Sequence, residues 1–107
     1  LPAGRRIFVL GDMGELGTDG VQLHQRLGLL AAELKIDQMY GLGVMSSTAC
    51  AAYGSPQSGF MTLEHLMEAL PPHELDAQTV VLVKGSRSAR MERVVAALMQ
   101  TQPQEAH

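Results

Sequence analysis

The sequence has 107 residues, of which 46% are hydrophobic and 18% charged, and its net charge is −3. This composition is typical of a single globular domain, which at this length buries roughly two-thirds of the surface exposed by its unfolded chain. Nucleic-acid binding is disfavoured, because the basic residues are scattered and two Tyr and two Phe without any Trp make a poor stacking platform.

Cys50 is the single cysteine, which excludes an internal disulfide and a cysteine-based zinc site. We expect it to be a small buried residue in a reducing compartment. No apolar run approaches ~20 residues, and no charged start leads into an apolar core. The sequence therefore predicts a cytoplasmic protein without a membrane span. Residues 1–4 are expected to be linker and residues 101–107 a flexible tail.

Strand and helix patterns alternate along the chain. Strands are predicted from short β-prone runs, helices from the i, i+3, i+4, i+7 spacing of apolar residues, and helix ends from capping residues, Gly and Pro. In chain order, the expected elements are a strand at 6–10, a helix at 18–34, a strand at 38–42, a helix from 46, 47 or 48 to 54, a strand at 58–61, a helix at 62–70, a strand at 79–84 and a helix at 88–100.

This alternation predicts an α/β fold, a Rossmann-like parallel sheet of about four strands flanked by helices. The last strand, Thr79 to Lys84, is expected to be buried on both faces because its apolar run is unbroken. With the common strand order 3-2-1-4, the sheet reverses direction between its first and fourth strands. Ligands of open α/β sheets bind at such a point, outside the carboxyl ends of the strands.

The loop after the first strand carries two carboxylates, Asp12 and Glu15, among three glycines. These acids could hold an amine, a ribose hydroxyl or a metal-bound water. Alternatively, Asp12 satisfies backbone amides in a turn and Glu15 is solvated. His24, on the border of the apolar face of the next helix, is more often a hydrogen-bonded packing residue than a catalyst.

The loop after the fourth strand combines Lys84, Ser86 and Arg87 with the expected start of the last helix. Free amides at a helix N-terminus and two cations suit a phosphate or carboxylate. Alternatively, a serine caps the helix and the cations extend into water. The loop is not a P-loop, because the GxxxxGK[ST] string is absent from the chain.

Two strings carry a family resemblance: VLGDMGELG at residues 9–17, followed by His24, and VLVKGSRSARME at residues 81–92. Together they resemble the C-terminal domain of the Mur ligases, in the branch that adds D-alanyl-D-alanine. The resemblance implies that Asp12, Glu15, His24, Lys84, Ser86 and Arg87 serve substrate or nucleotide binding. It does not say which of them contacts the dipeptide and which the ATP.

The resemblance also implies partners that lie outside this sequence. The substrates would be D-alanyl-D-alanine and UDP-N-acetylmuramoyl-tripeptide, with ATP and Mg²⁺ as cofactors of the full-length enzyme and neither bound tightly by this chain. The N-terminal domain and the central domain with its P-loop are missing, and so is the family's Asp-Ser-Tyr-Asn-Ala-Asn-Pro segment. We therefore expect no catalytic or metal-ligating residue here and no activity from the chain alone.

Two other classes of protein share parts of this pattern. A receiver-like signalling domain requires adjacent acids after the first strand and an acceptor Asp after the third, and the sequence has neither. A stand-alone Rossmann-like module for nucleotide binding or protein interaction uses the same cleft, and remains the alternative.

Overall fold

The structure is a computed structural model that describes residues 4–70, 75–85 and 89–100, without the side chains of Glu15, Leu16 and Gln100. Its elements are β1 (Arg5–Gly11), η1 (Gly14–Asp19), α1 (Gly20–Glu33), β2 (Gln38–Leu42), α2 (Val44–Tyr53), η2 (Pro56–Ser58), β3 (Gly59–Phe60), α3 (Leu63–Ala69), β4 (Thr79–Lys84) and α4 (Glu92–Gln100). None of the described helices is long and apolar enough to cross a bilayer.

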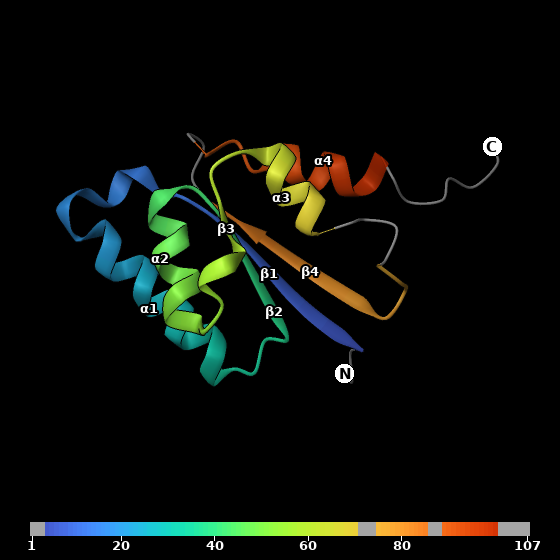
Figure 1. Cartoon of the computed structure of the whole chain (residues 1–107), viewed down its shortest axis with the longest axis horizontal. Coiled ribbons are helices and arrows are strands. Elements are labelled where there is room, and N and C mark those ends of the chain that lie inside the picture. Colours follow the sequence, from blue (N-terminus) through green and yellow to red (C-terminus); the bar gives the residue numbers. More distant parts are fainter. Residues whose placement is uncertain (1–3, 71–74, 86–88, 101–107) are drawn as a thin grey trace.

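The strands form one parallel sheet in the order β3-β2-β1-β4, which confirms the predicted fold class. The order is the common one considered above, which the sequence alone left open. Val9 is paired with Tyr40 of β2 on one side and with Val83 of β4 on the other. The chain thus reverses direction across the sheet between β1 and β4, as this strand order requires. The two strands that carry the predicted loops are neighbours (Figure 1).

Helices cover both faces of the sheet in pairs. Figure 1 shows α1 and α2 on one side and α3 and α4 on the other. Alternation along β1 divides the core accordingly: Phe8 and Leu10 pack in the cluster on the α1–α2 face, and Ile7 and Val9 in the cluster on the α3–α4 face. All four side chains are buried.

Local sequence signals explain several element ends. The side chain of Thr62 accepts a hydrogen bond from the backbone N–H of His65 (3.2 Å) and so caps α3, as predicted. Gly54 ends α2 in the left-handed conformation, with φ at 118°. Pro71 and Pro72, which are predicted to end α3, lie outside the described residues. Residues 1–3 of the predicted linker and residues 101–107 of the predicted tail also lie outside them. Gly4 is bound by its N–H to the carbonyl of Gln78 (3.0 Å).

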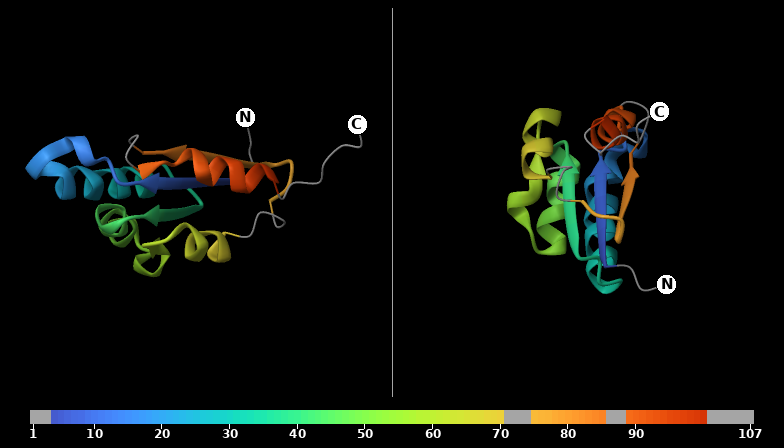
Figure 2. Two further views of the ribbon diagram at one scale, coloured as in Figure 1. Left: turned by 90° about the horizontal axis from the view of Figure 1, so that it is seen from above. Right: turned by 90° about the vertical axis from the view of Figure 1, so that its right-hand side faces the viewer.

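The prediction that β4 is buried on both faces is wrong. Its residues alternate between half-buried and exposed, and Val80 and Leu82 are 53% and 57% exposed. The physical reason is position, because β4 is the edge strand and no described helix covers its outer half on the α1 side (Figure 2, right).

The i, i+3, i+4, i+7 spacing of apolar residues also predicts inner-face positions for four residues that are exposed for the same reason. Leu30 and Leu34 of α1 and Val95 and Met99 of α4 overhang the edge of the sheet, with exposed fractions between 42% and 64%. Helical spacing identifies an apolar face correctly, but it does not say whether a neighbour covers that face.

Two helix starts also differ from the prediction. The helix expected to begin with a cap at Ser46, Ser47 or Thr48 begins at Val44, and its cap position is Gly43. The last helix, expected from Ser88, begins at Glu92 after a turn at 89–91, and Ser88 itself is outside the described residues. The start of α2 depends on a contact with a segment distant in the sequence, as described next.

Candidate functional site

The carboxyl ends of β1 and β4 meet at one point of the sheet edge. Leu10 is paired with Lys84, so Gly11 and Gly85 follow side by side. A Cβ added to Gly85 would lie 3.2 Å from the Cα of Gly11 and 2.6 Å from the Cγ of Met91. The two loops predicted to bind ligand therefore start in direct contact, and Met91 closes the space behind them.

Asp12, the first residue after β1, reaches across to the start of α2. Its Oδ1 accepts hydrogen bonds from the backbone N–H and the hydroxyl of Ser46, both at 2.8 Å, and its Oδ2 accepts one from the N–H of Met45 at 3.3 Å. A carboxylate at a helix N-terminus satisfies amides that have no partner within the helix and complements the helix dipole. Asp12 thus supplies the cap that α2 lacks in its own sequence.

Gly43 makes this cap sterically possible. Its φ of 121° lies in the region that favours glycine, and a Cβ there would come within 2.6 Å of the Asp12 carboxylate. The N–H of Asp12 also donates to the carbonyl of Leu42 (3.3 Å). The loop after β1 and the loop after β2 are consequently held together.

His24 is fully buried and holds the same loop from the other side. Its Nε2 accepts a hydrogen bond from the N–H of Met13 (3.1 Å), and its Nδ1 lies 2.6 Å from the carbonyl of Gly20. Because an amide N–H only donates, Nε2 must be unprotonated, and the ring is the neutral tautomer that donates from Nδ1. Both ring nitrogens of His24 are thus engaged within the domain, while its predicted role in binding stays a prediction.

Glu15 lies in η1, a six-residue segment that begins directly after Met13. Only its backbone is described. Gly17 departs from helical geometry within η1, with φ at 69° and ψ at −145°, and α1 then begins at Gly20. The helix predicted from Thr18 or Asp19 to Leu34 is therefore confirmed to within two residues.

On the second loop, Lys84 is exposed at the end of β4. Ser86 and Arg87 lie outside the described residues. Beyond them, the guanidinium of Arg93 donates to the carbonyls of Arg90 (3.0 Å) and Ala89 (3.2 Å) and holds the turn before α4. The first turn of α4 carries Glu92, so its dipole already has a negative partner.

Sequence reasoning missed two residues that build this site, Ser46 and Met91. Ser46 was considered only as a cap of its own helix, whereas it is the buried partner of Asp12. Met91 fits the apolar spacing before the last helix and lies in the core, but sequence reasoning gave no sign of its contact with both strand-end glycines. No local signal marks either role, since both depend on the parallel register of the sheet.

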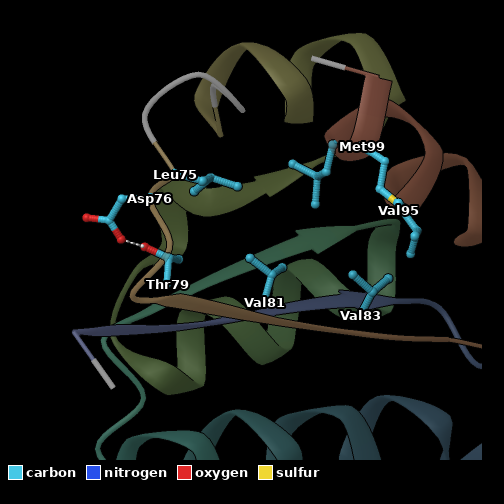
Figure 3. A pocket seen from close by; sticks show the side chains of 8 residues that line it. Leu75, Asp76, Thr79, Val81, Val83, Val95 and Met99 are labelled. Carbon is cyan, nitrogen blue, oxygen red and sulfur yellow. Dashed lines mark hydrogen bonds between the residues drawn. The ribbon is translucent and has the colours of Figure 1, made fainter. Parts of the chain in front are cut away.

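Hollows also lie away from these two loops. A hollow of about 300 Å³ lies beside β4, between Val81, Val83, Val95 and Met99 (Figure 3). It is lined mainly by apolar side chains, and Asp76 at its rim is bound to the hydroxyl of Thr79 (3.0 Å). Among the described residues, no three His, Cys, Asp or Glu side chains are grouped so that they could hold a metal ion.

Known proteins were compared with the chain in sequence and in structure. No family model matches it. It is 36% identical over 97 residues to the UDP-N-acetylmuramoyl-tripeptide–D-alanyl-D-alanine ligase of Buchnera aphidicola subsp. Acyrthosiphon pisum, covering 90% of this chain and 21% of that protein. The ligase of the same name from Escherichia coli is 37% identical over 98 residues, covering 91% of this chain and 22% of the ligase.

The structural comparison agrees. A crystal structure of MurF from Acinetobacter baumannii superimposes with a TM-score of 0.72 at 33% identity, covering 94% of this chain and 23% of that one. Sequence and structural similarity together assign the parallel four-stranded sheet and its paired helices to a class, the Mur ligase C-terminal domains. Within that class, the chain is similar to MurF, and it spans about a fifth of the length of these relatives.

Proposed function

We propose that this chain is the closing domain of the ATP-dependent ligase that adds D-alanyl-D-alanine to UDP-N-acetylmuramoyl-tripeptide in peptidoglycan synthesis, and thereby serves cell shape and division. The observation that supports this most is its similarity to two such ligases, at 36% and 37% identity over about nine-tenths of the chain. The cytoplasmic setting is part of the proposal, because the reaction consumes ATP.

In the proposed reaction, ATP phosphorylates the terminal carboxylate of the tripeptide. The amine of D-alanyl-D-alanine then attacks this acyl phosphate, an amide bond forms, and phosphate leaves. ATP and Mg²⁺ would be held outside this chain, since the sequence has no P-loop string and its described part no group of metal ligands. This domain would contribute binding and positioning groups at the cleft.

The geometry suggests how the site residues divide these tasks. Asp12 and His24 have their described polar contacts within the domain and would hold the loop after β1 in place. Glu15, on that loop, is then the carboxylate proposed to face the ammonium group of the dipeptide. Lys84 and Arg87, with Ser86 between them, are proposed to bind the dipeptide carboxylate or an ATP phosphate.

The proposal is tested by assaying phosphate release and ligation with the 107-residue chain and with a ligase polypeptide that contains it. The chain alone should show neither activity, and the longer polypeptide should lose ligation when the domain is deleted. Phosphate release by the chain alone that disappears in Lys84→Ala would instead identify a stand-alone nucleotide-binding module.

A further inference from the structure

His24 lies at the base of the loop at residues 14–19 and contacts both of its ends. Its Nε2 accepts a hydrogen bond from the N–H of Met13 (3.1 Å), the residue directly before η1. Its Nδ1 lies 2.6 Å from the carbonyl of Gly20, the residue directly after η1. One imidazole ring therefore joins the two ends of the segment that carries Glu15, which is the blue turn between β1 and α1 in Figure 1.

The neighbouring hydrogen bonds have a different role. Those of Asp12 fix the chain before Met13, by contacts with the carbonyl of Leu42 and with the first turn of α2. The N–H of Gly20 donates to the carbonyl of Gly17, which lies inside the loop. The backbone turns at Gly17, whose φ of 69° is a conformation that glycine adopts at little cost. Holding the two ends of such a segment together reduces the number of conformations open to it.

The ring of His24 is unsuited to contact a ligand directly. Its side chain is 0% exposed, and both ring nitrogens have partners inside the domain. A ligand would reach the ring only after one of these hydrogen bonds had broken, and a buried polar group left without its partner is costly. Any effect of His24 on a ligand therefore passes through the loop.

We propose that His24 is a positioning residue of the dipeptide site, which acts on D-alanyl-D-alanine through Glu15 by holding the ends of the loop at 14–19 together. This rests on the proposed function, in which Glu15 faces the ammonium group of the dipeptide. A carboxylate on a fixed loop binds such a group more tightly than one on a mobile loop, because less conformational entropy is lost on binding. The neutral ring that donates from Nδ1 and accepts at Nε2 is the form that makes both contacts.

Two substitutions separate the two contacts of the ring. The amide of Gln extends about as far from the backbone as Nε2 of His, so the side-chain carbonyl of His24→Gln can accept the N–H of Met13. The shorter amide of His24→Asn extends only as far as Nδ1, so it can donate to the carbonyl of Gly20 but does not reach Met13. His24→Gln therefore keeps the contact across the loop, and His24→Asn is its matched control.

Steady-state kinetics of a ligase polypeptide that contains this domain tests the positioning role. His24→Asn should raise the KM for D-alanyl-D-alanine by about tenfold, the equivalent of one lost hydrogen bond. The KM for the tripeptide substrate and kcat should stay within about twofold of wild type, because the loop is proposed to bind the dipeptide alone. His24→Gln should keep the KM for the dipeptide within about threefold of wild type. Equal increases for both substitutions would overturn the proposal.

Two measurements on the same polypeptide report on the loop without any substrate. Hydrogen exchange of the amides at 13–19 should be faster in His24→Asn than in wild type and His24→Gln, while β2 exchanges equally in all three. Nitrogen NMR of the wild type with labelled histidine should show His24 as the tautomer protonated at Nδ1, assigned by the signals missing from His24→Gln. Equal exchange of the loop in all three, or protonation at Nε2 in the wild type, would overturn the contact across the loop.

The outcomes separate this role of His24 from the proposed function itself. A wild-type polypeptide that does not ligate D-alanyl-D-alanine would overturn the proposed function, and the exchange and NMR measurements would still decide whether His24 holds the loop. Faster exchange of the loop in His24→Asn together with a wild-type KM for the dipeptide would overturn the positioning role and leave the proposed function standing.

Discussion

The carboxylate of Asp12 and both donors of Ser46 form a single hydrogen-bonded unit, with the backbone N–H and the hydroxyl each 2.8 Å from Oδ1. The two residues are 34 positions apart, and their contact ties the loop after β1 to the first turn of α2. Ser46 is fully buried, so no water can replace the carboxylate without rearrangement.

Asp12→Ala should therefore destabilise the chain by about 1–3 kcal/mol, the cost of leaving buried donors without an acceptor. Urea denaturation followed by circular dichroism measures this. Asp19→Ala is the control, because Asp19 is exposed at the N-cap of α1 and makes no side-chain cap bond. It should change stability by less than about 0.5 kcal/mol. Equal effects of the two substitutions would show that Asp12 does not cap α2.

Gly28 provides a test in which two physical effects have opposite signs. In a helix, replacing Gly by Ala normally stabilises by about 1 kcal/mol. Here α1 crosses α2 so closely that a Cβ at Gly28 would lie 2.9 Å from the carbonyl carbon of Ala49, a backbone atom that cannot turn aside. Overpacking of this kind costs about 1–3 kcal/mol, so we expect Gly28→Ala to be destabilising on balance.

The midpoint temperature of thermal unfolding shows whether Gly28→Ala stabilises or destabilises the chain. A higher midpoint for Gly28→Ala would mean that the helices separate at little cost. Leu29→Ala, at the exposed neighbouring position, should leave the midpoint nearly unchanged and so controls for effects of the helix itself.

Burial raises the pKa of the Cys50 thiol from 9.0 to about 11. The folded chain thus holds this proton more tightly than the unfolded chain does. The resulting stabilisation is fully present below pH 9 and is lost as the pH rises from 9 towards 11. At pH 8, the folded chain should contain about a hundredfold less thiolate than an ordinary cysteine, since two pKa units separate them.

Iodoacetamide labelling at pH 8 checks this prediction. The folded chain should react at least a hundredfold more slowly than the chain in urea, and mass spectrometry follows both reactions. Comparable rates in the two conditions would show that Cys50 is accessible in the native state.

The sequence predicted all four strands and two of the four helices, α1 and α3, closely, because hydrophobic periodicity and local caps determine these features. The burial of β4 was mispredicted because an apolar run indicates a strand but does not show whether that strand lies at the centre or at the edge of the sheet. The start of α2 was mispredicted because its cap, Asp12, comes from another loop.

In the candidate site too, some features follow from the sequence and others depend on the tertiary structure. The approach of the two loops followed from the strand order, and Asp12 and His24 were identified as polar residues of one motif. Their internal hydrogen bonds depend on tertiary distances that sequence spacing does not contain. Of the six predicted residues, Ser86 and Arg87 remain predictions from sequence, as does the ligand-binding role of all six.

Arg87 is the residue on which the proposed dipeptide site can be tested most sharply, in a ligase polypeptide that contains this domain. A charge-assisted bond between its guanidinium and the carboxylate of D-alanyl-D-alanine would contribute about 1.5–3 kcal/mol, or roughly ten- to a hundredfold in binding. Arg87→Ala should then raise the apparent KM for the dipeptide by about that factor and change the KM for the tripeptide substrate much less. Lys35→Ala removes an exposed cation after the C-terminal end of α1, far from the loops, and should leave all constants unchanged. Steady-state kinetics with each substrate varied in turn distinguishes the outcomes. A change in the KM for ATP alone would indicate that the loop after β4 contacts the nucleotide. Wild-type constants for all three substrates would show that Arg87 does not belong to the site.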